Sequence, residues 1–185
     1  MAAQFTVNAS FTGFREANRQ IDKIIAQVER RGNRRALNKA SRPIIKGARR
    51  KVRRRHGDLR KSLGNVIRME KKTGAIISII GPRRGRKRVV DGKPVDPANY
   101  AHLVEYGTQP HEIKPRNPAG ALPVGNDQFA GTVQHPGTPA APFLRPAYDE
   151  NKNEATKVYG EVIGGFIESE AKKANARIVS GKVRV

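Results

Sequence analysis

The sequence predicts an α+β fold, with an N-terminal helical pair and a C-terminal helix packed on a small antiparallel sheet, and with long Pro/Gly-rich and basic loops. Three observations predict it: two apolar stripes of helical period near the N-terminus, two short apolar runs separated by a turn, and a third helical stripe near the C-terminus. A chain of 185 residues suits a single domain over 1–175, followed by a C-terminal tail at 176–185.

The first helical stripe lies near the N-terminus. Apolar and polar residues alternate over 5–11, which indicates a short strand. Apolar residues then recur on one helical face and predict a helix over about 13–31. Gly32 and Asn33 follow this stripe and are typical of a helix C-cap.

A second helical stripe runs from Leu37 to Val52, and arginine and lysine cover the opposite face. Pro43 lies inside it and should kink or restart the helix, because proline lacks an amide hydrogen and clashes with the preceding turn. Two helices joined by a short turn at Gly32 would pack as an antiparallel pair.

The sheet is predicted in the middle of the chain. Residues 65–69 and 75–80 have the composition of strands, and 71–74 forms a plausible hairpin turn between them. The second strand is rich in isoleucine, which favours a central place in a sheet. Residues 81–97 then read as a mobile basic loop.

The last part of the chain alternates loops with helix. A short helix or turn is expected over 98–106, ending at Gly107, and a long Pro/Gly-rich loop with short strands over 107–142, ordered by neighbouring subunits. Pro146 suits the first turn of the final helix. The Gly164-Gly165 pair weakens that helix, since each glycine costs about 1 kcal/mol relative to alanine.

Positive charge dominates the composition. Lys and Arg number 37 against 16 Asp and Glu, which gives a formal net charge of +21. Such an excess attracts polyanions or acidic protein surfaces. For the basic run from Arg30 to Lys61, contact with DNA or an acidic protein and a plain solvated helix face stay open as alternatives. The candidates for contact with DNA or an acidic partner are Arg49, Arg50, Arg53, Arg54, Arg55, Arg83, Arg84, Arg86, Lys87 and Arg88.

Several function classes find no support in the residues. The chain has no cysteine, no signal-peptide pattern at its N-terminus and no apolar run of about 20 residues, so we expect no thiolate metal site and no membrane span. Residues 81–88 lack the Gly-Lys-Ser/Thr ending of a phosphate-binding loop. No catalytic signature is recognisable, so no enzyme and no cofactor are expected. We expect no metal site at the histidines, because nothing in the sequence shows that they converge; they are His56, His102, His111 and His135.

Three segments carry a family resemblance. They are His56-Gly57-Asp58-Leu59-Arg60-Lys61-Ser62-Leu63, then Tyr100-Ala101-His102-Leu103-Val104-Glu105-Tyr106-Gly107-Thr108, and finally His135-Pro136-Gly137-Thr138 with Pro142-Phe143-Leu144-Arg145-Pro146-Ala147. In this order and spacing they resemble the gene-product-ten family of lambdoid long-tailed phages, the neck or tail-completion proteins. The resemblance covers about residues 10–170 and assigns no role to 83–88 or 107–135.

The resemblance implies a non-catalytic virion protein that forms a ring at the head–tail junction, joining the capsid connector to the tail tube around the DNA path. The implied partners are copies of the chain itself, as a hexamer or else a dodecamer, the connector or stopper, the tail-tube or terminator proteins, and passing double-stranded DNA bound without sequence specificity. Assembly would take place in the host cytoplasm. The alternative is a basic protein that binds nucleic acid non-specifically.

The family motifs also have physical interpretations. Gly107 can adopt a positive φ that ends its element sharply. Glu105 is expected to pair with an arginine, within a subunit or between subunits. Phe143 and Leu144 would anchor the final helix in the core, or else in a neighbour. The candidate interface residues are Glu105, Tyr106, Gly107, Phe143, Leu144 and Arg145.

Overall fold

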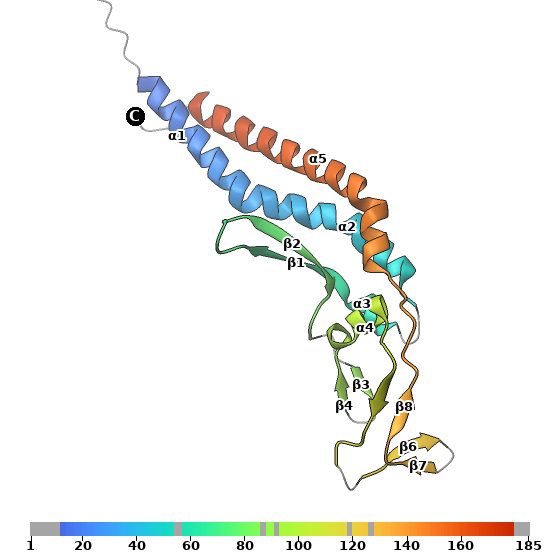
Figure 1. Cartoon of the computed structure of the whole chain (residues 1–185). Coiled ribbons are helices and arrows are strands. Elements are labelled where there is room, and N and C mark those ends of the chain that lie inside the picture. The colour runs from blue at the N-terminus through green and yellow to red at the C-terminus, as the bar shows by residue number, and fades with distance from the viewer. Residues whose placement is uncertain are drawn as a thin grey trace, which may run out of the picture. The chain divides into compact units, whose positions relative to one another are not determined.

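Figure 1 shows the chain in a computed structural model, which describes residues 12–53, 57–85, 88–90, 93–117, 120–125 and 128–179. The strand expected over 5–11 and residues 180–185 of the expected tail lie outside this range. The fold class is α+β, as the sequence predicts. Two compact units make up the chain: the helical unit, which is Met1–Arg42, Ile67–Ser78 and Asn153–Val185, and the central unit, which is Pro43–Val66 and Ile79–Lys152.

The N-terminal helices follow one another without a turn. Helix α1 spans Thr12–Gln27, a π-helical turn, η1, spans Val28–Gly32, and α2 spans Asn33–Lys51. The C-cap predicted at Gly32 is therefore wrong, and so is the antiparallel packing predicted for the two helices, because one continues into the other. Gly32 is buried, and a Cβ there would lie 3.0 Å from side-chain atoms of both Ile163 and Phe166. The glycine permits a close helix–helix approach instead of ending a helix.

Helix α2 runs through Pro43, so the restart, which is one of the two predicted alternatives, does not occur. Its apolar stripe is buried as predicted, because those positions recur on one face. The buried members of the stripe are Ala40, Ile44, Ile45, Ala48 and Val52, with Ala36 beside them.

The predicted hairpin forms in the middle of the chain. Strand β1 spans Leu63–Met69, β2 spans Ile76–Pro82, and the two form a two-stranded sheet. The amide of Glu70 donates to the carbonyl of Ala75 at 2.8 Å, which closes the turn. A central place for β2 is wrong, since among the described residues it has β1 as its one strand neighbour.

The basic loop over 81–97 contains a second, smaller hairpin. Strand β3, Arg88–Val90, pairs antiparallel with β4, Lys93–Val95. Asp96 follows β4 and is 8% exposed. Its carboxylate accepts from the amides of Gly85 at 2.8 Å and Ala98 at 3.0 Å. This one acid therefore ties the loop to the start of the 3-10 turn η2, Pro97–Asn99.

Short strands also occur in the Pro/Gly-rich loop, as predicted. Strand β5, His111–Ile113, pairs antiparallel with β8, Val133–His135. Strand β6, Leu122–Gly125, pairs antiparallel with β7, Gln128–Ala130. The short helix α4, Ala101–Tyr106, leads into this region. Gly107 is its C-cap, where the sequence places the end of an element.

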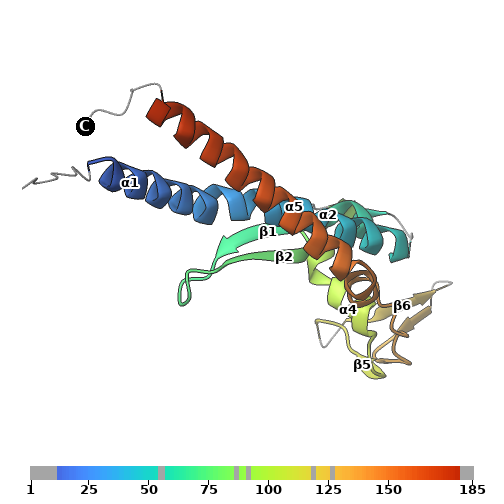
Figure 2. The ribbon, with the colours of Figure 1, turned by 90° about the horizontal axis from the view of Figure 1, so that it is seen from above.

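The final helix, α5, spans Leu144–Val179 and continues through the glycine pair. Pro146 lies in its first turn, as predicted. In the helical unit, α5 runs antiparallel to α1, and the two helices diverge towards the chain termini (Figure 2). None of the helices in the described ranges is both long and apolar enough to cross a membrane.

The apolar core of the central unit lies where α2, α3 (Asp58–Ser62), α4 and the start of α5 meet. Phe143 is fully buried there and Leu63 is 2% exposed. The other buried members are Ile45, Ala48, Val52, Leu59, Ala101 and Ala147. This core contains residues of all three sequence segments that carry the family resemblance.

Candidate functional site

Glu105 caps the long helix α5. Its side chain is 7% exposed. One carboxylate oxygen, Oε2, accepts from the amides of Phe143 at 2.8 Å and Leu144 at 2.9 Å, and Oε1 accepts from the amide of Arg145 at 3.0 Å. The first amides of a helix have no partner inside the helix, and they carry the positive end of its dipole. A carboxylate from α4 therefore satisfies three donors that α5 leaves open.

The electrostatics of Glu105 follow from this geometry. Burial acts to raise the pKa of Glu105, but hydrogen bonds from the three amides, together with the positive charge of Arg145, outweigh burial and hold this pKa below its ordinary value of 4.5. The carboxylate is therefore ionised at neutral pH. The predicted partner was an arginine side chain, whereas three backbone amides make the hydrogen bonds.

A backbone bridge joins the second and third family motifs. Thr108 and Thr138 form an isolated antiparallel bridge, in which the Thr108 amide donates to Thr138 at 2.9 Å and the Thr138 amide donates to Thr108 at 3.1 Å. Gly107 has φ 73°, as predicted from the motif. A Cβ at Gly107 would lie 2.5 Å from the Thr138 carbonyl oxygen. Gly137 has φ 86°, and a Cβ there would collide with the Thr108 carbonyl oxygen.

Together these contacts form a structural lock, which we define as Glu105, Gly107, Thr108, Gly137 and Thr138. The lock joins α4, the β5–β8 ladder and the start of α5. Its parts come from two sequence motifs that lie far apart in the chain. The chemistry of the lock is hydrogen bonding and close backbone packing, and it positions the central unit's elements.

Two histidines meet next to the lock. His111 and His135 are paired across the β5–β8 ladder, with ring centroids 5.0 Å apart. The Nδ1 atom of His111 lies 2.8 Å from the Gln109 carbonyl, and Nδ1 of His135 accepts from the Gly137 amide at 3.0 Å. Across the described ranges, no group of three or more potential metal ligands comes together.

The predicted interface residues divide into buried and exposed members. Glu105 and Phe143 lie inside the central unit, where they serve the lock and the core. Tyr106 is 73% exposed, and Arg145 is also exposed. An interface with other subunits stays a prediction, and it depends on these exposed side chains.

The predicted basic contacts also differ among themselves. The guanidinium of Arg49 donates to the carbonyl of Leu63 at 2.7 Å, so this side chain supports the fold. Four others are exposed in the central unit: Arg50, Arg53, Arg83 and Arg84. The predictions for Arg54, Arg55, Arg86 and Lys87 lie outside the described residues, as does the side chain of Arg88.

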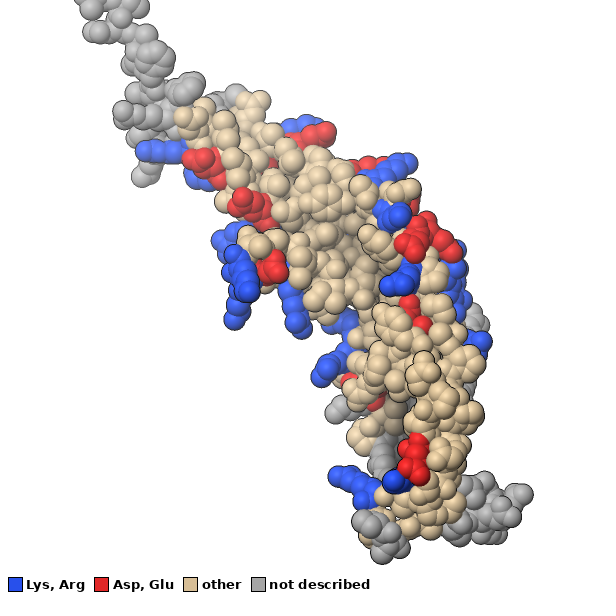
Figure 3. Space-filling model, in the orientation of Figure 1, with Lys and Arg blue, Asp and Glu red and all other residues tan. Residues whose placement is uncertain are grey.

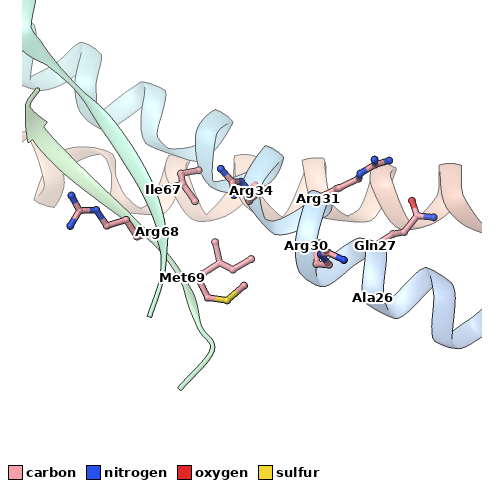
Figure 4. Close-up of a pocket in the computed structure, with 9 residues that line it drawn as sticks. Ala26, Gln27, Arg30, Arg31, Arg34, Ile67, Arg68 and Met69 are labelled. Atoms are coloured by element: carbon pink, nitrogen blue, oxygen red, sulfur yellow. The ribbon is translucent and has the colours of Figure 1, made fainter. Parts of the chain in front are cut away.

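A basic cleft lies elsewhere, in the helical unit. It has a volume of about 640 Å³ and lies between the helical segment around η1 and the hairpin. Figure 4 shows Ile67 and Met69 on the side of β1 that faces the helix, and Arg68 on the opposite side. Among the described residues, no acidic side chain lines this cleft. Its lining is Ala26, Gln27, Arg30, Arg31, Arg34, Ile67, Arg68, Met69 and Ile76.

A second hollow of about 440 Å³ adjoins the first and shares three of its arginines. We call the residues that line it the arginine face: Arg30, Arg31, Arg34, Arg35, Asn38, Lys39 and Arg42. Its six cationic side chains are all exposed, and no acidic side chain within the described part of the chain pairs with them. Over α5, by contrast, acidic and basic side chains are mixed (Figure 3).

A partly buried hydrogen bond joins the elements that form the two walls of the cleft. The Ser41 hydroxyl, 3% exposed, lies 2.8 Å from the Ser78 hydroxyl of β2 and donates to the Leu37 carbonyl at 2.7 Å. The hairpin is therefore fixed to α2 within the helical unit. The sequence identifies the basic run that contains the arginine face, but the individual contact residues that it predicts lie further along the chain.

Comparison with known proteins identifies the family. No curated protein and no solved structure matches the chain. The model of one family, described as "Bacteriophage HK97-gp10, putative tail-component", matches residues 15–107, which is half of the chain. The match begins in α1 and ends at Gly107 of the lock. The family that the sequence motifs predicted is thus confirmed, and the chain belongs to the HK97-gp10-like family of bacteriophage tail components.

Proposed function

We propose that this chain forms a closed ring at the head–tail junction of a long-tailed phage, where it joins the capsid connector to the tail tube around the DNA path. Membership of a family of structural tail components supports a role in the virion. Closed symmetry would satisfy interfaces that a single copy leaves open. The role is binding and involves no catalysis, and six-fold or twelve-fold rings suit the proposal.

The observation that carries this proposal is the unpaired positive charge. The arginine face has no acidic partner among the described residues, and the whole chain carries a net charge of +21. Charge of this density repels itself unless acidic surfaces or polyanions lie nearby. A junction ring meets both, since it contacts neighbouring virion proteins and surrounds passing DNA.

The partners follow from this position in the particle. The connector or stopper would bind one side of the ring, and the tail-tube or terminator proteins the other. Passing double-stranded DNA would be contacted without sequence specificity, through phosphates. The exposed arginines of the central unit remain candidates for such contacts, and Tyr106 and Arg145 remain candidates for contacts between subunits.

Purified particles test the proposal directly. We expect mass spectrometry of virions to detect this chain in a ring-sized copy number. Deletion of its coding sequence should yield filled heads without tails, together with free tails. Normal tailed particles from the deletion strain would contradict a joining role.

A second candidate function is non-specific binding of nucleic acid away from the virion, which the same net charge of +21 favours. Gel-shift assays at physiological salt separate the two functions. A junction protein should bind free duplex DNA weakly and be found in virions. Tight duplex binding by a protein that is missing from virions would favour the second function.

A further inference from the structure

The cleft of the helical unit combines two kinds of surface. Ile67, Met69 and Ile76 of the hairpin give it an apolar wall, and Met69 is 62% exposed. Arg30 and Arg34 belong to the opposite, helical wall. A surface of this composition is complementary to a ligand that has carboxylates and apolar side chains close together.

We propose that this cleft is a docking site for an acidic segment of another virion protein, one that carries apolar side chains between its carboxylates. This inference rests on the proposed function, since it names the chemistry of one neighbour in the particle. The carboxylates would bind the arginines, and an apolar side chain would cover Met69 and Ile76.

Charge favours a segment of a different protein over a second copy of this chain as the occupant of the cleft. Each copy carries a net charge of +21, so a second copy that approaches the arginine face is repelled overall. Like charge across an interface disfavours association, and opposite charge speeds association and selects the partner. An acidic segment from a different protein removes this repulsion.

Size and polarity decide between a protein segment and DNA. A cleft of about 640 Å³ has room for a few side chains and not for the body of a duplex. Phosphates gain nothing from an isoleucine and methionine wall, whereas leucine or phenylalanine side chains remove it from water. The partly buried Ser41–Ser78 hydrogen bond also fixes the two walls before a partner arrives, which lowers the entropic cost of binding.

The test uses the purified full-length chain and three fluorescent probes. The first probe is a 12-residue glutamate-rich peptide with two leucines one helical turn apart. The second replaces both leucines with serine, and the third is a short DNA duplex. We expect fluorescence anisotropy at about 0.15 M salt, where charge interactions reach about 8 Å, to show at least tenfold tighter binding of the leucine peptide than of the serine peptide.

Matched variants locate the binding. Arg30→Gln with Arg34→Gln should weaken leucine-peptide binding at least tenfold, whereas Lys157→Gln with Lys172→Gln removes the same charge from exposed positions on α5 and should change it less than threefold. Met69→Ser should weaken it several-fold, and Ile77→Ser, an exposed residue on the neighbouring strand outside the cleft, should not.

Two outcomes would overturn the inference. Equal losses in both double variants would mean that net charge alone drives binding. If the DNA duplex binds more tightly than the leucine peptide, and if Arg30→Gln with Arg34→Gln abolishes that binding, the cleft is a nucleic-acid site. Both outcomes leave the joining role open, because that role is decided by particles from the deletion strain.

Discussion

The buried acids of the central unit and the arginine face of the helical unit differ in how their charges are compensated. In the central unit, the buried carboxylates of Glu105 and Asp96 accept hydrogen bonds from backbone amides, and the guanidinium of Arg49 donates a hydrogen bond to a backbone carbonyl. In the helical unit, the arginines around Arg30 are exposed without an acidic partner in the described residues. A charge whose hydrogen bonds are satisfied inside the chain fixes the fold, whereas a charge left in solvent is available to partners.

The largest effect should come from the lock. Gly107 has φ 73° and ψ −174°, a backbone region that is almost closed to residues with a Cβ, and its Cβ position is 2.5 Å from the Thr138 carbonyl oxygen. Gly107→Ala should therefore lower the free energy of unfolding by about 3 kcal/mol or more. Urea denaturation followed by circular dichroism measures this.

Gly74 provides the matched control for Gly107. It also has a positive φ, 70°, but a Cβ there would meet nothing within 4 Å. Gly74→Ala should thus lower the free energy of unfolding by only about 1 kcal/mol, because it adds the cost of a positive φ but no steric clash. Equal losses at the two positions would show that the close contact with Thr138 contributes nothing.

Removal of the helix cap should have the next largest effect. Glu105→Ala leaves three amides at the start of α5 without their acceptor, and we expect a loss of about 2–3 kcal/mol in the free energy of unfolding. Glu105→Gln keeps an acceptor oxygen but loses the charge, so it should lose about half as much. Glu154→Ala, at an exposed site on the same helix, should stay within about 0.5 kcal/mol of the wild type.

The same cap predicts a pH dependence. Because the pKa of Glu105 is lowered in the folded state, its contribution is fully present above the ordinary value of 4.5 and is lost as pH falls through the lower folded value. The difference in Tm between the wild type and Glu105→Gln should therefore be constant above about pH 5 and shrink below pH 4.5. A difference that grows on acidification would contradict the cap.

The elements that the sequence predicted well are those decided by local pattern. The α2 stripe, the turn before Gly74, the positive φ of Gly107 and the place of Pro146 each depend on a few neighbouring residues. Periodicity and backbone preference act over such distances, so the prediction needs no knowledge of the rest of the fold.

The features that were missed depend on residues far away in the sequence. Gly32 looks like a helix end, but the contacts of η1 with Ile163 and Phe166 determine its role. Glu105 was recognised as an isolated acid, whereas its partners are amides 38 to 40 positions later. The basic run was recognised too, but which of its arginines line a cleft depends on the hairpin that packs beside them.

Loss of charge should change the stability in opposite directions at Arg49 of the central unit and at Arg35 and Lys39 of the arginine face. Arg49→Gln removes a guanidinium that donates to the Leu63 carbonyl, and we expect a loss of about 1 kcal/mol. Arg35→Gln with Lys39→Gln removes two like charges one turn apart on α2, which should raise stability by about 0.3–0.5 kcal/mol. Thermal unfolding at low salt measures both, and a loss in the second variant would show that the arginine face supports the fold.

The smallest effect should come from Thr108→Val, which distinguishes the contribution of the lock's backbone to stability from that of its side chains. The Thr108 hydroxyl is buried and has no hydrogen-bond partner among the described residues, while its backbone makes both bonds of the bridge to Thr138. Thr108→Val keeps the shape and the bridge and removes a buried polar group, so the free energy of unfolding should stay within about 0.5 kcal/mol of the wild type or rise. If the lock depends on backbone geometry, this variant is stable while Gly107→Ala is not. If Thr108→Val instead lowers the free energy of unfolding by more than about 1 kcal/mol, the hydroxyl makes a stabilising hydrogen bond, and the lock depends on side chains as well as on the backbone.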